Sequence, residues 1–221
     1  MTVASPRLSY EERSALTRTA LIGASIATIN RLGYAGATTA IIAKKAGMTR
    51  GAFLHHFSNR ATLMAEVVRH VFDQEMAEYE QVREVSGLGN HLSDWPKILW
   101  EVLARPSGLA VLEILQATRS DPELAAAVLP MQEQVESAAL ASIRNTFGGD
   151  ERSARALMRL MVWTARGLSI AESFIPAQPD TTDAVNMLSS LLRIASPGGT
   201  LVELTRSLSQ ADRPMANAGP A

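Results

Sequence analysis

Apolar residues recur at helical spacing along most of this 221-residue chain, and that periodicity leaves few folds open. No window alternates apolar and polar residues between turn signals, as a half-buried strand would. Ser, Thr, Asn or Asp precedes several of the apolar stripes and Gly follows them, and these are the residues that start and end helices. We therefore expect an all-α protein.

Four helices are expected before residue 86. In chain order they cover residues 10–32, 39–46, 49–58 and 59–85. The residues that set their boundaries are Ser9 or Ser14, Gly33 and Gly36, Thr38 or Thr39, Gly47, Thr49 and Asn59. The apolar stripe of the fourth helix consists of Leu63, Val67 and Val71, continued by Ala77 and Glu78.

Six further helices are expected after a glycine-containing loop at residues 86–90. They cover residues 95–104, 107–119, 122–147, 150–174, 181–195 and 201–208. Ser107 is expected to cap the second of them, and Pro130 to kink or split the third. Asp121 and Pro122 form a cap followed by a proline at the first helical position, and Pro176 and Pro179 end the fourth helix.

Charge is distributed unevenly along the chain. Residues 1–60 carry eight basic and two acidic side chains, whereas the rest carries 13 basic and 20 acidic ones. Such an asymmetry favours a polyanion-binding segment joined to a second domain. The alternative is a basic surface that has no partner.

Several classes of protein are excluded or disfavoured. The chain has no cysteine, and therefore neither a disulfide framework nor a thiolate metal site. No uncharged apolar run of 18 residues and no signal peptide is found, so we expect a cytoplasmic protein that does not engage a membrane. Adjacent His55 and His56 point about 100° apart on a helix, so no metal site is expected. No catalytic motif is found, and we expect neither an enzyme nor a cofactor.

The segment from Thr38 to His56 has the pattern of a helix-turn-helix. Its second helix buries Phe53 and Phe57 on one face and exposes Arg50, Gly51 and His55. An arginine can form two hydrogen bonds with a guanine in the major groove, and a glycine lets the backbone approach the DNA. The phosphate-contacting residues are predicted to be Lys44, Lys45 and Arg60, together with the helix starts at Thr39 and Thr49.

The stretch TTAIIAKKAGMTRGAFLHHFSNRATL resembles the DNA-binding domain of the TetR family of bacterial transcriptional regulators. The residues that carry the resemblance are Gly33, Thr38, Thr39, Ile42, Ala43, Ala46, Gly47, Gly51, His56, Phe57 and Leu63. The resemblance implies a homodimer with a variable C-terminal domain that binds a small molecule and dimerises. It also implies that Thr39 contacts phosphate and that Arg60 replaces a phosphate-binding lysine. The residues implied to face the groove are Thr49, Arg50, Gly51 and His55. Leu54 departs from the pattern, because the family most often has a tyrosine there.

Four functional parts are predicted from these patterns. They are a three-helix helix-turn-helix DNA-binding domain at residues 1–58, a connecting helix at 59–85, a helical ligand-binding and dimerisation domain at 86–195, and a tail at 196–221. The predicted effector-lining residues are Trp100, Gln116, Arg119, Met161, Trp163 and Arg166. If Arg166 lines a cavity, a carboxylate ligand becomes plausible.

The helices at 150–174 and 181–195 carry more apolar surface than one domain hides. The resemblance implies that they form a four-helix bundle with their two-fold mates. The small residues that would permit close approach are Ala165, Gly167, Ala171, Ser189 and Ser190.

The leading hypothesis is a dimeric transcriptional regulator, a repressor, that binds a palindromic double-stranded operator and is released by a small apolar or amphipathic effector. The alternative is an all-α binding module whose basic N-terminal segment engages a protein or a membrane surface. A gel shift with the DNA that flanks the gene separates the two hypotheses.

Overall fold

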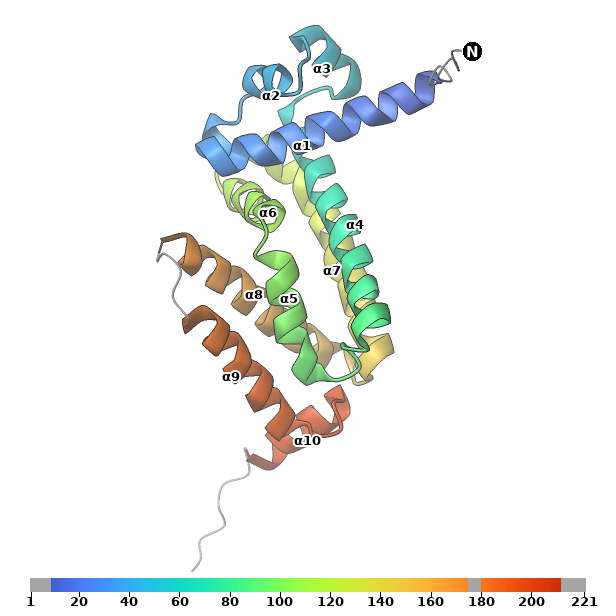
Figure 1. Ribbon diagram of the computed structural model, residues 1–221, viewed down its shortest axis with the longest axis vertical. Helices are drawn as coiled ribbons and strands as arrows, with labels where there is room; N and C mark the ends of the chain where they lie inside the picture. The colour runs from blue at the N-terminus through green and yellow to red at the C-terminus, as the bar shows by residue number, and fades with distance from the viewer. Residues whose placement is uncertain (1–8, 175–179, 212–221) are drawn as a thin grey trace, which may run out of the picture. The chain divides into compact units, whose positions relative to one another are not determined.

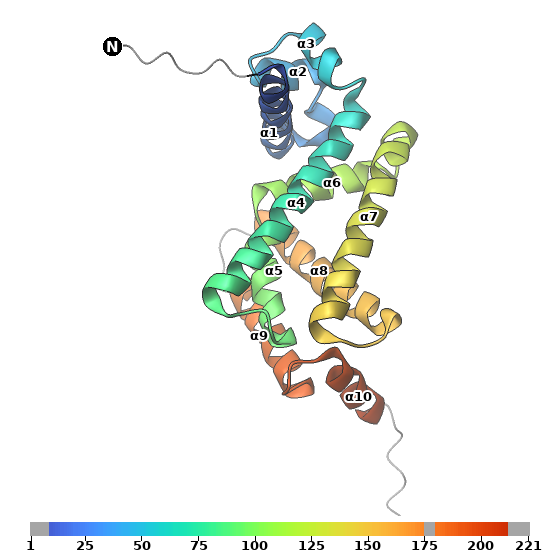
Figure 2. The same cartoon turned by 90° about the vertical axis from the view of Figure 1, so that its right-hand side faces the viewer.

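The computed structural model describes residues 9–174 and 180–211, and within these ranges the chain is helical with no strand (Figures 1 and 2). The all-α prediction is therefore confirmed. The helices are α1 (Tyr10–Gly36), α2 (Thr39–Lys45), α3 (Arg50–His56), α4 (Arg60–Ser86), the 3-10 turn η1 (Leu92–Asp94), α5 (Trp95–Leu103), α6 (Pro106–Ala117), α7 (Pro122–Phe147), α8 (Glu151–Phe174), α9 (Asp180–Ala195) and α10 (Leu201–Ala211). The predicted helix stops at Pro176 and Pro179, and the end of the tail after residue 211, lie outside the described residues.

Helix starts lie close to where the local chemistry predicted them. Ser9 forms a capping box with Glu12, and Thr38 rather than Thr39 caps α2. Asn59 accepts a hydrogen bond from the N–H of Thr62 at 2.8 Å. Each cap satisfies a first-turn N–H group that has no partner within its helix.

Three differences from the predicted helices have a local cause. α6 begins at Pro106, before the predicted cap Ser107, since a proline suits the first helical position. α7 is one helix through Pro130 (Figure 2), where the carbonyl that loses its partner belongs to the exposed Ala126, which water can hydrate. α1 continues past Gly33 to Gly36, with a kink at Gly33.

The kink in α1 occurs at a position that only glycine adopts easily. Gly33 has φ +72°, in the left-handed region. The kink takes the N–H of Tyr34 out of the helix ladder, and that N–H donates to Glu113 Oε2 at 2.6 Å. Gly33 therefore serves to turn the end of α1 toward a hydrogen bond with α6.

The chain divides into two compact units. The first comprises the residues up to Phe72 with Leu109–Glu133, and its core includes Leu21, Phe53 and Leu63. The second comprises Asp73–Gly108 with the residues from Gln134 onward. This division follows packing, and the functional ranges predicted from the sequence stay a prediction.

The second unit has an aromatic centre. The ring of Trp95 lies 5.6 Å from that of Tyr79 and 5.9 Å from that of Phe147, between centroids. The indole N–H of Trp95 donates to the carbonyl of Gly89 at 3.0 Å, so its polar atom is satisfied. In Figure 1, α8 and α9 lie beside α5, which carries much of this core. Within the described ranges, no helix combines the length and the apolar character that crossing a membrane requires.

Candidate functional site

α2 and α3 are two short helices joined by a tight turn. The turn passes through Gly47, whose φ is +70°. Thr49 then caps α3, and its side chain accepts a hydrogen bond from the N–H of Ala52 at 3.2 Å. The result is the helix-turn-helix that the sequence predicted, with seven residues in each helix.

The two faces of α3 differ in burial as predicted. Phe53 and Phe57 are 0% and 1% exposed, and their ring centroids lie 6.1 Å apart in the core of the first unit. Arg50, Gly51 and His55 are exposed. The side chains predicted to read bases are therefore accessible.

Two exposed lysines flank this face. Lys44 and Lys45 occupy the last turn of α2, and Thr39, at its start, is partly exposed. Contact with phosphates remains a prediction for all three residues.

Arg60, the fourth predicted phosphate contact, is engaged within the first unit. Its guanidinium lies over the ring of Tyr34, 3.8 Å from the centroid, and donates to the Tyr34 carbonyl. Its Nε is buried without a hydrogen-bond partner. Arg60 must therefore leave Tyr34 before it can meet a phosphate.

Tyr10 and Arg18 of α1 position α3, and the sequence analysis missed both. The hydroxyl of Tyr10 lies 3.2 Å from Nε2 of His55. The guanidinium of Arg18 donates to the carbonyl of His56 at 3.3 Å, covers the ring of Phe57 at 4.6 Å, and forms an ion pair with Glu66. These partners are 38 to 48 residues apart in the sequence, so no local pattern points to them.

His56 is half-buried beside Arg18, unlike the exposed residues of α3 that are predicted to contact DNA. Burial, and then the neighbouring His55 and Arg18, lower the pKa of His56. The imidazole is therefore neutral at neutral pH, in keeping with a packing residue.

The six predicted effector-lining residues are divided between the units. Gln116 and Arg119 are exposed in the first unit, and the other four lie in the second. In the second unit Met161 and Arg166 are buried, and Trp100 is half-buried. Their role as ligand contacts remains a prediction.

Trp163 is 51% exposed, yet its ring approaches a buried charge. The guanidinium carbon of Arg166 lies 5.6 Å from the ring centroid. These two predicted residues are therefore brought together, with the arginine on the inner side.

Arg166 shares its surroundings with two residues of α4 that the sequence analysis missed. Glu75 is 8% and Tyr79 7% exposed. They continue the stripe of Val67 and Val71 at four-residue steps. The predicted continuation to Ala77 and Glu78 is wrong, since Ala77 is exposed and Glu78 is only partly buried. Extending the stripe of α4 from Val71 in steps of four residues predicts that Glu75 and Tyr79 are buried.

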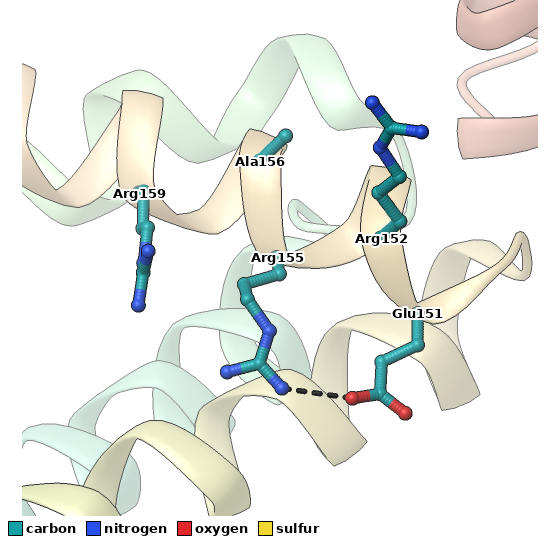
Figure 3. A pocket seen from close by; sticks show the side chains of 5 residues that line it. All are labelled: Glu151, Arg152, Arg155, Ala156 and Arg159. Atoms are coloured by element: carbon teal, nitrogen blue, oxygen red, sulfur yellow. Dashed lines mark hydrogen bonds and ion pairs between the residues drawn. The ribbon is translucent and has the colours of Figure 1, made fainter.

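A pocket lies elsewhere, along the outer face of α8 (Figure 3). Its lining residues are Glu151, Arg152, Arg155, Ala156 and Arg159. Arg155 is paired with Glu151 at 2.8 Å and with Glu136 at 3.1 Å, and Arg159 also reaches Glu136. None of the six predicted effector residues belongs to this pocket, and two of its three arginines are paired with these carboxylates.

Comparisons with known proteins agree with this geometry. The profile of the family "Bacterial regulatory proteins, tetR family" matches residues 21–67. The chain is 26% identical over 188 residues to an uncharacterised HTH-type transcriptional regulator of Mycobacterium tuberculosis (strain ATCC 25618 / H37Rv), and the match covers 83% of this chain and 96% of that relative.

Solved structures show a similar fold. A transcriptional regulator from Rhodococcus sp. Rha1 matches with a TM-score of 0.61 at 20% identity, covering 80% of this chain and 95% of that one. NalD, the secondary repressor of the MexAB-OprM multidrug efflux pump in Pseudomonas aeruginosa, matches with a TM-score of 0.56 at 22% identity, covering 81% and 95%.

Proposed function

The chain belongs to the TetR family of bacterial transcriptional regulators, and we propose that it represses transcription by binding a palindromic operator as a homodimer. Each subunit places α3 in one major groove, with the two helices about one DNA turn, roughly 34 Å, apart. The similarity of its fold to that of the repressor NalD supports repression. The chain is a regulator and not an enzyme.

The observation that carries this proposal is the burial pattern of α3. Phe53 and Phe57 fix one face in the core, which leaves Arg50, Gly51 and His55 on the outside. A two-turn helix with a guanidinium at its start and an accessible backbone suits a major groove about 12 Å wide.

A gel shift with the DNA that flanks the gene tests the proposal. We expect sharp binding to one site that weakens steeply as salt is raised, because phosphate contacts release counterions. Equal binding to this DNA and to random DNA would contradict operator recognition. The absence of any DNA binding would favour the all-α protein-binding module instead.

Arg50→Ala should weaken binding to the cognate DNA by about 5- to 150-fold, which corresponds to the loss of about 1–3 kcal/mol from one bidentate base contact. Lys45→Ala is the matched control, since both residues are exposed in the helix-turn-helix. The lysine variant should lose affinity for cognate and random DNA alike. Fluorescence anisotropy with both DNAs measures how much affinity each variant loses for cognate and for random DNA. If Arg50→Ala loses equal affinity for the two DNAs, its base-reading role is refuted.

An exposed apolar surface on α8 and α9 supports the homodimer. The large side chains that form it are Leu160, Trp163, Phe174, Met187, Leu191 and Ile194, each more than half exposed. Gly167 and Ser190 are exposed on the same helices, whereas Ala165 and Ser189 are buried within the unit, so only part of the predicted small-residue set can face a second copy. Several large apolar side chains exposed on two helices are typical of a contact with another chain.

Leu191→Lys should weaken the dimer at least about tenfold, because two-fold symmetry places the new charge in the interface twice. Leu129→Lys is the control: it makes the same change at an exposed leucine of α7. Analytical ultracentrifugation measures both dissociation constants. Loss of the dimer in the control alone, or in neither variant, would place the interface elsewhere.

The effector is proposed to act through α4. We assign residues 1–58 to DNA binding, 59–85 to the connection and 86–195 to effector binding and dimerisation. α4 contributes residues to both compact units, so a ligand that shifts it can change the operator affinity. A coupling free energy of about 1–3 kcal/mol between effector binding and DNA binding gives a 5- to 150-fold change in operator affinity.

A further inference from the structure

The second unit contains two buried charged side chains whose hydrogen-bonding atoms are unsatisfied. Arg166 of α8 and Glu75 of α4 are each 8% exposed. Nε and Nη1 of Arg166 and Oε1 of Glu75 have no hydrogen-bond partner. A buried charge without partners is strongly unfavourable. Proteins therefore retain one where a further group, such as a ligand, supplies the missing hydrogen bonds and the opposite charge.

The two charges influence one another without touching. Among the described residues, no ion pair of 4.0 Å or less joins Arg166 to Glu75, although each is the largest charge acting on the other's pKa. The other charged groups around Glu75 are Glu78 and Arg105, which pair with each other. Tyr79, one turn further along α4, also faces Arg166 and Glu75.

The electrostatics of this site favour an anion. Burial lowers the pKa of Arg166, but a guanidinium remains protonated at neutral pH. Burial raises the pKa of Glu75 to about 7, so its carboxyl group carries only part of a negative charge at neutral pH. The guanidinium is therefore incompletely compensated, and a carboxyl group beside it holds a proton that it can donate.

We propose that Arg166 and Glu75 form the polar end of the effector site and bind the carboxylate of a small monocarboxylic acid. The ligand carboxylate accepts hydrogen bonds from the guanidinium of Arg166, and Glu75, in its protonated form, donates to the same carboxylate. The ring of Trp163 also lies near the guanidinium, with its centroid 5.6 Å from the guanidinium carbon. This proposal rests on the effector-responsive function proposed above and specifies the ligand's charge.

A cation or a neutral amide does not satisfy the same groups. A cation is repelled by Arg166, which cannot lose its proton. A neutral amide offers an oxygen acceptor but no charge to balance the buried guanidinium. Water can hydrogen-bond to the free atoms but leaves the charge uncompensated, and water alone is an outcome that the experiment can detect.

The experiment uses matched pairs of ligands on the full-length protein. Formate, acetate, butyrate and benzoate are each compared with the corresponding amide by thermal shift, and the best pair by calorimetry at pH 6 and pH 8. We expect at least one carboxylate to raise Tm where its amide does not. We also expect about tenfold tighter carboxylate binding at pH 6, because binding takes up the proton of Glu75. If no carboxylate exceeds its amide, or if the affinity is equal at both pH values, the proposal is overturned.

Two variants separate a ligand site from a structural charge. Arg166→Met should abolish the difference between carboxylate and amide and raise the Tm of the free protein, because an uncompensated buried charge is removed. Arg166→Lys keeps the charge and should retain a reduced preference for the carboxylate. A lower Tm in Arg166→Met with an unchanged carboxylate preference would overturn the proposal. A parallel gel shift distinguishes failure of this proposal from failure of the proposed operator binding. If the protein binds DNA but no carboxylate has any effect, only the carboxylate site is refuted.

Discussion

Phe53→Ala should lower the free energy of unfolding by about 3–5 kcal/mol, the loss typical of a large aromatic side chain removed from a core. Phe53 has no exposed surface, and its ring packs with that of Phe57. Because domains are stable by only about 5–15 kcal/mol, this loss consumes a large part of the stability of the first unit. Urea unfolding followed by circular dichroism measures it.

Leu54→Ala is the control, since Leu54 is the next residue of the same helix and is 50% exposed. Its free energy of unfolding should change by less than about 0.5 kcal/mol. Similar losses in both variants would mean that α3 presents a different face to the core. In that case the exposed position of Arg50, on which the proposed operator recognition rests, would also be wrong.

The sequence predicted helix starts well because capping is a local interaction. The bond from Thr49 to the N–H of Ala52 spans three residues, and so does that from Ser9 to Glu12. The buried face of α3 was equally predictable, because the four-residue spacing of Phe53 and Phe57 indicates a shared side, and both are buried although α3 ends at His56. Local spacing alone therefore predicted which residues of α3 are exposed, including those predicted to read bases.

Interactions between distant segments were not predictable in the same way. Arg60 was expected to reach DNA, but its guanidinium lies over Tyr34, 26 residues earlier. Likewise, nothing near His55 in the sequence indicates that the hydroxyl of Tyr10 lies beside it. A long side chain takes whichever partner the tertiary fold provides, and one sequence does not specify that partner.

Glu75→Gln should make the protein more stable at pH 8 than the unmodified chain and little different at pH 5. The pKa of Glu75 is about 7 in the folded state, against its ordinary value of about 4.5 in the unfolded chain. The folded state therefore holds this proton more tightly, and the resulting stabilisation is complete below about pH 4.5 and lost as the pH rises through 7. The loss is on the order of 3 kcal/mol, and glutamine, which does not titrate, avoids it. Urea unfolding at a series of pH values measures the difference.

Glu80→Gln provides the control on the same helix, because Glu80 is exposed and pairs with Arg83 at the surface. Surface pairs contribute about 0–1 kcal/mol, so its effect should be small and nearly independent of pH. A constant effect of Glu75→Gln between pH 5 and pH 8 would mean that Glu75 does not change its charge in this range. Arg166 would then compensate the carboxylate fully, and no uncompensated positive charge would remain in the second unit to attract an anionic effector.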